Sequence, residues 1–173
     1  MKDVFDIINT RASTKAYTDK APSATDIDKI IHAGLRAASG RNLQAPIIVA
    51  ITNKEVRDRL AKANGAVINS DADPFYGAPA VLVVLAKKSV RTRVYDGSLV
   101  LGNMMLAAHA LGLGSCWIHR AREVFELPEW QKWLESVGID EEVEGIGNLI
   151  LGYPDGEIPE PKEIKGNRVF YIK

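Results

Sequence analysis

A short segment near the start of the chain carries the residue types of an anion-binding site. Arg11, Ser13 and Lys15 alternate with other residues in a polar stretch, 11–19, that we expect to be extended. Side chains alternate along an extended segment, so these three would point to one side. A guanidinium donates paired hydrogen bonds to phosphate oxygens, and an ammonium adds a point charge. The spacing therefore predicts a phosphate site, with a solvated polar linker as the alternative.

Further polar groups lie in two loops and in the tail. They are Ser39, Asn42 and Gln44 in the loop 37–46, Asn69 in the loop 63–78, and Lys162, Lys165 and Arg168 near the end. Amide side chains suit a planar ring whose edge alternates donors and acceptors. Taken one at a time, the loop residues are typical turn formers and the lysines are typical surface residues. Their combination with the cationic segment favours a ligand that has both a phosphate and a ring.

Other common chemistries lack their motifs. His32, His109 and His119 are scattered without a cysteine or carboxylate at metal-ligand spacing, so we expect no metal. In the Gly112-Leu113-Gly114 stretch a helix precedes the glycines and a strand follows, the reverse of a Rossmann loop. Cys116 lies in an apolar run, which favours an inert buried thiol over a nucleophile.

Length and charge limit the class of protein. A chain of 173 residues predicts one domain, spanning 1–173. Lysine and arginine together number 22, as do aspartate and glutamate, and this balance argues against nucleic-acid or anionic-membrane partners. The longest apolar stretch, 99–113, is too short and too polar to span a bilayer. With one cysteine and no apolar run in its first ten residues, the chain is expected in the cytoplasm.

The hydrophobic pattern predicts a mixed α+β domain. Helices are expected at 3–9, after a Ser23 cap, at 55–62, at 97–111 and from Pro128 to Gly138, and strands at 47–52, 80–86, 115–119, 146–151 and 169–172. In the second helix, Leu35 and Ala38 are expected to continue the buried face that begins at Ile27. The final strand has no local partner, which suggests an arm that reaches a second subunit.

Five motifs in order make the chain resemble the FMN-dependent nitroreductase family. They are Ile7-Ile8-Asn9-Thr10-Arg11-Ala12-Ser13-Thr14-Lys15-Ala16-Tyr17, Ala37-Ala38-Ser39-Gly40-Arg41-Asn42-Leu43-Gln44, Asp96-Gly97-Ser98, Leu111-Gly112-Leu113-Gly114-Ser115-Cys116-Trp117-Ile118, and Leu151-Gly152-Tyr153-Pro154. Each motif is weak alone, but their order and spacing cover nearly the whole chain.

The resemblance implies an α+β fold with a central, mostly antiparallel sheet flanked by helices. It also implies a homodimer in which residues of about 155–173 form an exchanged arm and two FMN molecules lie at the subunit interface. The expected FMN contacts are Arg11, Ala12, Ser13 and Lys15; Ala38, Ser39 and Asn42 from the partner; Asn69 at the pyrimidine edge; Trp117, Ile118 and His119 along the ring; and Lys162 or Lys165 at the phosphate.

The implied activity is reduction of nitroaromatics, quinones or similar electron-poor compounds by NAD(P)H, with both substrates using one pocket in turn. The flavin N5 would accept the hydride, so no catalytic side chain is required; His119 is a candidate pocket residue. Two alternatives stay open. One is a flavin-binding or sensing module with little turnover, because Ile164 stands where many members have arginine. The other is a specialised dehalogenase or flavin-fragmenting enzyme.

Overall fold

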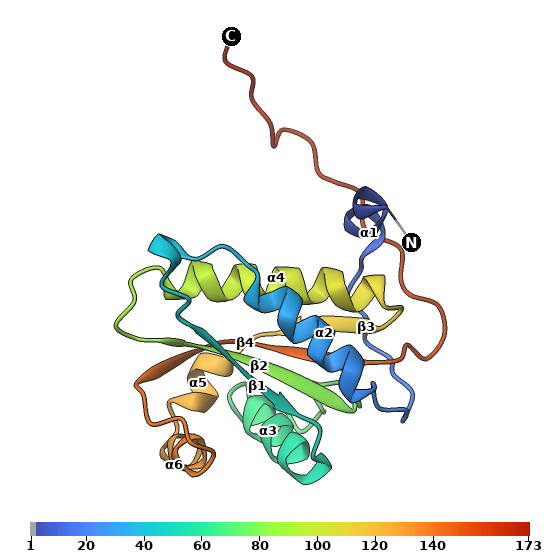
Figure 1. Cartoon of the computed structure of the whole chain (residues 1–173). Helices are drawn as coiled ribbons and strands as arrows, with labels where there is room; N and C mark the ends of the chain where they lie inside the picture. The colour runs from blue at the N-terminus through green and yellow to red at the C-terminus, as the bar shows by residue number, and fades with distance from the viewer. Residues whose placement is uncertain (1–2) are drawn as a thin grey trace.

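A computed structural model describes residues 3–173, so the first two residues of the predicted domain lie outside the described part. One antiparallel sheet has the strand order β1-β2-β4-β3 (Figure 1). The elements are α1 (Val4–Thr10), α2 (Ala24–Leu35), a 3₁₀ turn (Gly40–Asn42), β1 (Pro46–Ile51), α3 (Lys54–Ala66), β2 (Ala80–Lys87), α4 (Arg93–Ala110), β3 (Gly114–Ile118), α5 (Ala121–Phe125), α6 (Pro128–Ser136) and β4 (Val143–Gly152). The predicted α+β class with an antiparallel sheet is confirmed.

The sheet is covered by helices on both faces (Figure 1). Along β2, Val81 and Val83 belong to the core beneath α3, α5 and α6, whereas Leu82 and Val84 belong to the core beneath α2 and α4. Successive side chains of a strand point to opposite faces, so a strand buried on both faces must be apolar throughout. This explains the uninterrupted apolar run of β2.

Helix α4 lies close against the sheet because small residues face it. A Cβ atom at Gly97 would lie 2.7 Å from the side chain of Ile146 in β4, and one at Gly34 in α2 would lie 2.6 Å from Met104 in α4. Both spacings are shorter than non-bonded carbon contacts allow. These glycines therefore set how closely α4 approaches β4 and α2.

Two predicted helix starts are confirmed. The Ser23 side chain accepts a hydrogen bond from Asp26 N at 3.1 Å, as an N-cap does. Pro128 occupies the first turn of α6, where its missing N–H removes no intrahelical bond.

Several boundaries are corrected. Helix α3 is 13 residues long, not a short surface helix, and it buries Leu60 and Ala61. Helix α4 begins at Arg93, four residues before the predicted start. Helix α5 was not predicted because its five residues form no amphipathic pattern of their own; they pack against β4 and α3. Leu35 and Ala38 are exposed, because α2 ends at Leu35 and turns away from the core.

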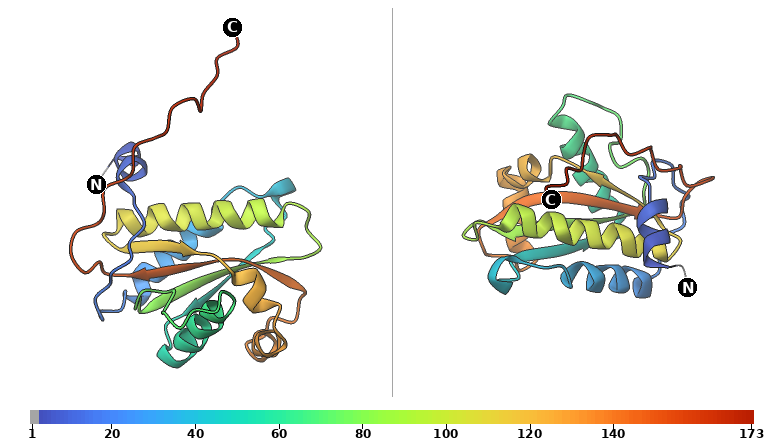
Figure 2. Two further views of the ribbon diagram at one scale, coloured as in Figure 1. Left: turned by 180° about the vertical axis from the view of Figure 1, so that it is seen from behind. Right: turned by 90° about the horizontal axis from the view of Figure 1, so that it is seen from above.

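The tail leaves the body of the molecule beside α1 and extends away from it (Figure 2). The predicted strand at 169–172 is wrong for the single chain: these residues form no strand, and Phe170 is 82% exposed. An apolar segment without a neighbouring strand edge has nothing to pair with. Within residues 3–173, no helix is long and apolar enough to cross a membrane.

Candidate active site

The cationic segment is attached to the open edge of the sheet at β3. Thr14 N donates to Ser115 O at 3.0 Å, and Thr18 N donates to Tyr153 O at 3.0 Å. Thr14 is 3% exposed, whereas Ser13 and Lys15 on either side of it are exposed. The predicted extended conformation is confirmed, and its alternation places Ser13 and Lys15 on the side away from the core.

Arg11 follows the last residue of α1 and has an unsatisfied donor. Its Nη1 atom is buried and makes no hydrogen bond within residues 3–173. The preceding Thr10 Oγ1 lies 2.8 Å from Nε2 of His109, near the end of α4. A buried guanidinium nitrogen without a partner is costly, and a phosphate oxygen is a suitable acceptor for it. This orphaned donor fits the phosphate of a mononucleotide.

Lys15 lies against the loop that precedes β2. Its Nζ atom is 5.6 Å from the centre of the Tyr76 ring, within range of a cation–π interaction. Asp73 shapes this loop by accepting from Phe75 N at 2.8 Å and Gly77 N at 2.9 Å, and the buried Arg57 donates to it at 2.6 Å. Partial burial alone would raise the pKa of Asp73, but these bonds outweigh it and lower the pKa.

The Tyr17 hydroxyl is held in its protonated form. Burial raises the pKa of its hydroxyl, and the nearby Cys116 adds to the rise. The hydroxyl donates to Thr14 O at 2.7 Å. Tyr17 therefore stays protonated and supports the segment that carries Lys15.

Strand β3 divides its side chains between the two cores. Cys116 faces the α3 side and is 6% exposed, in agreement with the predicted buried thiol. Trp117 packs on the other face, against Gly147 and Leu101, and its Nε1 has no partner within the described part of the chain. Ile118 is buried, and His119 is exposed just beyond the strand.

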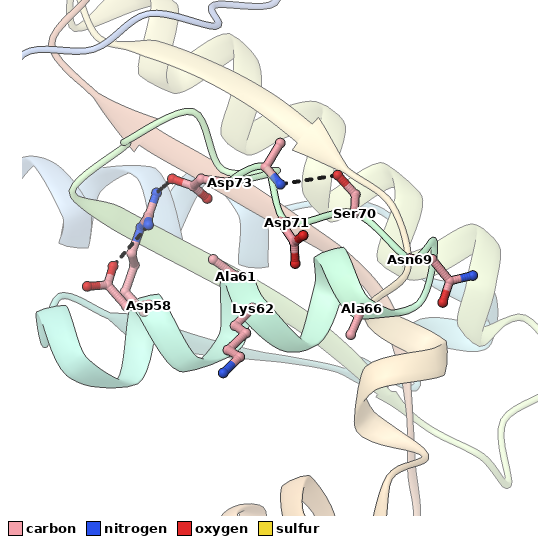
Figure 3. A pocket seen from close by; sticks show the side chains of 10 residues that line it. Asp58, Ala61, Lys62, Ala66, Asn69, Ser70, Asp71 and Asp73 are labelled. Carbon is pink, nitrogen blue, oxygen red and sulfur yellow. Dashed lines mark hydrogen bonds and ion pairs between the residues drawn. The ribbon is translucent and has the colours of Figure 1, made fainter.

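Asn69 lies in a left-handed conformation, with φ 53°, in the loop after α3. It lines a hollow of about 680 Å³ together with Arg57, Asp58 and Asp73. In Figure 3 its side chain points away from the ion pair of Arg57 and Asp73. The structure thus separates the amide from the carboxylates that share its hollow.

The loop 37–46 lies at the opposite end of α4 from Arg11. Gly40 N donates to Asp96 Oδ1 at 3.0 Å, and Asp96 is 3% exposed in the first turn of α4. Asp96 and His109 are 13 positions apart on this helix, which corresponds to about 20 Å of rise. Ser39 and Asn42 are therefore far from Arg11 within one chain.

The tail lysines differ in position. Lys162 lines a hollow of about 820 Å³ with Asn9, Thr10 and His109, close to the end of α1. Lys165 lies beyond this hollow and is exposed. The structure thus places Lys162 in the same hollow as Thr10, the residue before Arg11, whereas Lys165 does not line it.

Three polar residues near the C-terminal end of β3 were not predicted from the sequence. Asn64 and Asn148 are each 0% exposed, and Arg120 is left-handed with φ 71°. The one available signal was Asn148, a polar residue inside the apolar run of β4. Asn64 and Arg120 join it only through tertiary contacts.

Comparison with known proteins identifies the family. The model of the nitroreductase family matches residues 8–73 and 68–153. A protein of Archaeoglobus fulgidus, provisionally named NADH dehydrogenase/NAD(P)H nitroreductase, is 30% identical over 91% of this chain and 88% of its own. This chain belongs to the nitroreductase family.

Solved structures and a further sequence relative agree with this membership. A nitroreductase of Bacteroides fragilis with bound FMN superposes with a TM-score of 0.90 over 100% of both chains, at 27% identity. The Bacillus subtilis FMN reductase [NAD(P)H] is 25% identical over 89% of this chain and 67% of its own. Iodotyrosine deiodinase bound to FMN and 3-iodo-L-tyrosine has a TM-score of 0.75 at 21% identity, which shows a common fold.

Proposed function

We propose that this chain is an FMN-dependent oxidoreductase that takes electrons from NAD(P)H and reduces nitroaromatics, quinones or similar electron-poor compounds. The observation that carries the proposal is the buried, unpartnered Nη1 of Arg11 beside the exposed Ser13 and Lys15. These are the donors that a flavin phosphate and ribityl chain require. FMN-bound members of the same family support the assignment.

The chain's own residues would hold the cofactor and shape its surroundings. Arg11, Ser13 and Lys162 would bind the phosphate end. Lys15 and Asn69 would donate to the pyrimidine side, where a hydrogen-bond donor can stabilise developing charge by about 3–4 kcal/mol. The edge of β3 would lie along the ring. Bound FMN supplies hydride transfer, so the protein needs no catalytic acid or base.

A homodimer is part of this proposal, because the two groups of predicted contacts lie at opposite ends of α4. The outward face of this helix carries Tyr95, 73% exposed, and Leu99, 51% exposed. A Cβ at Gly102 on the helix would meet nothing within 4 Å, so a second helix can approach there. Ser39 and Asn42 of a second copy would then complete the site begun by Arg11.

The same proposal gives roles to the remaining segments. Residues 1–173 form a single domain, and about 155–173 serve as the arm that reaches the second subunit. The apolar residues of the arm, among them Phe170 and Tyr171, are more than 80% exposed in the single chain and would be buried there. Location in the cytoplasm stays a prediction from composition.

The test is the response of the flavin-loaded protein to nicotinamides without oxygen. We expect NADH or NADPH to bleach the visible flavin absorbance and a nitroaromatic or quinone to restore it. Protein that binds FMN but is bleached by neither nicotinamide would instead be a binding module. Failure to retain added FMN would contradict the proposal altogether.

A further inference from the structure

A buried polar network holds the main chain just beyond β3. The Nδ2 atom of Asn64 donates to His119 O at 2.8 Å. From β4, Asn148 Nδ2 lies 3.4 Å from both Ile118 O and His119 O. The Nε atom of Arg120 donates back to Asn64, at 3.1 Å to Oδ1 and 3.2 Å to the main-chain oxygen. Both asparagines are 0% exposed, whereas Arg120 is half-buried, so the network extends from the interior toward the surface.

The network fixes the direction of two main-chain donors. All described peptide bonds are trans, so each N–H points opposite to the preceding carbonyl. Holding the oxygens of Ile118 and His119 toward the asparagines turns the N–H groups of His119 and Arg120 away from them. Within residues 3–173, neither N–H group has a hydrogen-bond partner. The end of β3 thus presents two adjacent free donors.

The backbone conformation of Arg120 also indicates a functional site at the end of β3. Its φ of 71° is left-handed, which costs energy for a residue other than glycine. Such a conformation persists only where surrounding contacts impose it, and such sites are often functional. Here the contacts are the two hydrogen bonds from its guanidinium to Asn64.

We propose that Asn64 and Asn148 are positioning residues that orient the His119 and Arg120 amides toward bound FMN. The inference rests on the proposed function, which places the edge of β3 along the flavin ring. It adds that these two main-chain amides are oriented by side chains of α3 and β4, which are not among the proposed cofactor contacts. Two buried amides that share the His119 oxygen as their acceptor suit this role because they leave it few alternative positions.

The experiment compares FMN binding by wild-type and Asn64→Ala apoprotein, followed by quenching of flavin fluorescence. Loss of one orienting hydrogen bond should weaken binding about tenfold. The midpoint potential of the bound flavin should become less negative, because an amide that donates to N5 stabilises the oxidised ring, whose N5 is an acceptor, more than the reduced ring, whose N5 carries a hydrogen. Asn53→Ala is the matched control, since Asn53 caps the other end of α3 by accepting from Val56 N at 3.0 Å. It should retain the wild-type dissociation constant and potential.

A second variant keeps the test open if Asn64→Ala does not fold. Arg120→Gly removes the guanidinium bonds but tolerates the left-handed backbone, and it should weaken binding about threefold. Wild-type dissociation constants and potentials in every folded variant would overturn the positioning role and leave the proposed function intact. Wild-type protein that binds no FMN would overturn both.

Discussion

The two ends of α4 carry two halves of the candidate site, built in different ways. At the C-terminal end, the segment containing Arg11 and Lys15 is attached to the edge of β3 by main-chain hydrogen bonds. At the N-terminal end, the loop with Ser39 and Asn42 is attached through one buried carboxylate, Asp96. The first half is joined to the sheet by main-chain bonds, whereas the Ser39–Asn42 part of the second is bonded to α4 through the Asp96 side chain. Since a helix separates them, the site proposed above would be completed only by a second chain.

The largest effect is expected from breaking the contact that would bring the halves together. Leu99→Glu places a charge on the exposed apolar face of α4 and should give a monomer. The monomer should bind FMN at least about a hundredfold more weakly, because it has only one half of each site. Light scattering and fluorescence titration measure the two effects. Gln131→Glu on the exposed face of α6 is the control, and an intact dimer in Leu99→Glu would exclude this face as the interface.

The second-largest effect is expected from removing Arg11, the proposed hydrogen-bond donor to the phosphate. Arg11→Ala eliminates the buried, unpartnered Nη1 and should weaken FMN binding by about ten- to a hundredfold while leaving the dimer intact. Fluorescence titration of the apoprotein measures the loss. Arg36→Ala, on an exposed arginine after α2, should bind FMN as the wild type does. Equal binding by Arg11→Ala and wild type would place the phosphate elsewhere.

The sequence predicted best where local pattern and tertiary structure agree. The apolar runs of β2 and β4, the Ser23 cap and Pro128 all act through their own neighbours, and the structure confirms each. Helix α5 was missed because five residues have no period to detect, and packing on β4 stabilises them.

The same contrast between local pattern and tertiary contact applies to the residues of the candidate site. The alternation of Ser13, Thr14 and Lys15 is visible in sequence because an extended segment has a fixed period. Asn64 and Arg120 are 56 positions apart, and nothing local indicates that they share hydrogen bonds. The exposure of Leu35 contradicted the predicted buried face, since periodicity alone does not say where a helix leaves the core.

A smaller loss of FMN binding is expected when the loop with Ser39 and Asn42 is no longer bonded to α4. Asp96→Ala removes the acceptor for Gly40 N and for Thr92 Oγ1, which should cost about 1–3 kcal/mol of stability. FMN binding should weaken several-fold, less than in Arg11→Ala, because the loop is displaced rather than removed. Thermal unfolding and titration separate the two effects. Binding as tight as that of the wild type would show that the loop does not contribute to the site.

Substitutions of the tail lysines test which of them contacts the phosphate in the half of the site that contains Arg11. Lys165→Ala should weaken FMN binding about twofold to fivefold if a partner's phosphate lies near it, as an exposed charge-assisted contact would. Lys162→Ala, nearer Arg11, should weaken it at least as much. Lys173→Ala is the control. Unchanged affinity in Lys165→Ala would exclude this lysine and point to Lys162 or Arg168 as the phosphate contact.

The smallest effect concerns the loop that carries Tyr76. The lowered pKa of Asp73 means that its ionised form stabilises the fold above the ordinary value of 3.8, and that this contribution is lost as pH falls through the lowered pKa. Asp73→Asn should therefore be less stable than wild type near neutral pH, and the difference should shrink below the ordinary value. Urea unfolding across pH measures it. A difference that stays constant in acid would contradict the ion pair with Arg57.

Mixing two defective chains tests most directly whether each site is built from both. One chain carries Arg11→Ala, and the other carries Ser39→Ala with Asn42→Ala. In a mixed dimer, one site receives both defects and the other receives none. After the subunits are exchanged, high-affinity FMN binding should return at one site in each mixed dimer, although neither parent shows it. A mixture of confirmed mixed dimers that binds FMN no better than its parents would show that each chain holds its flavin alone.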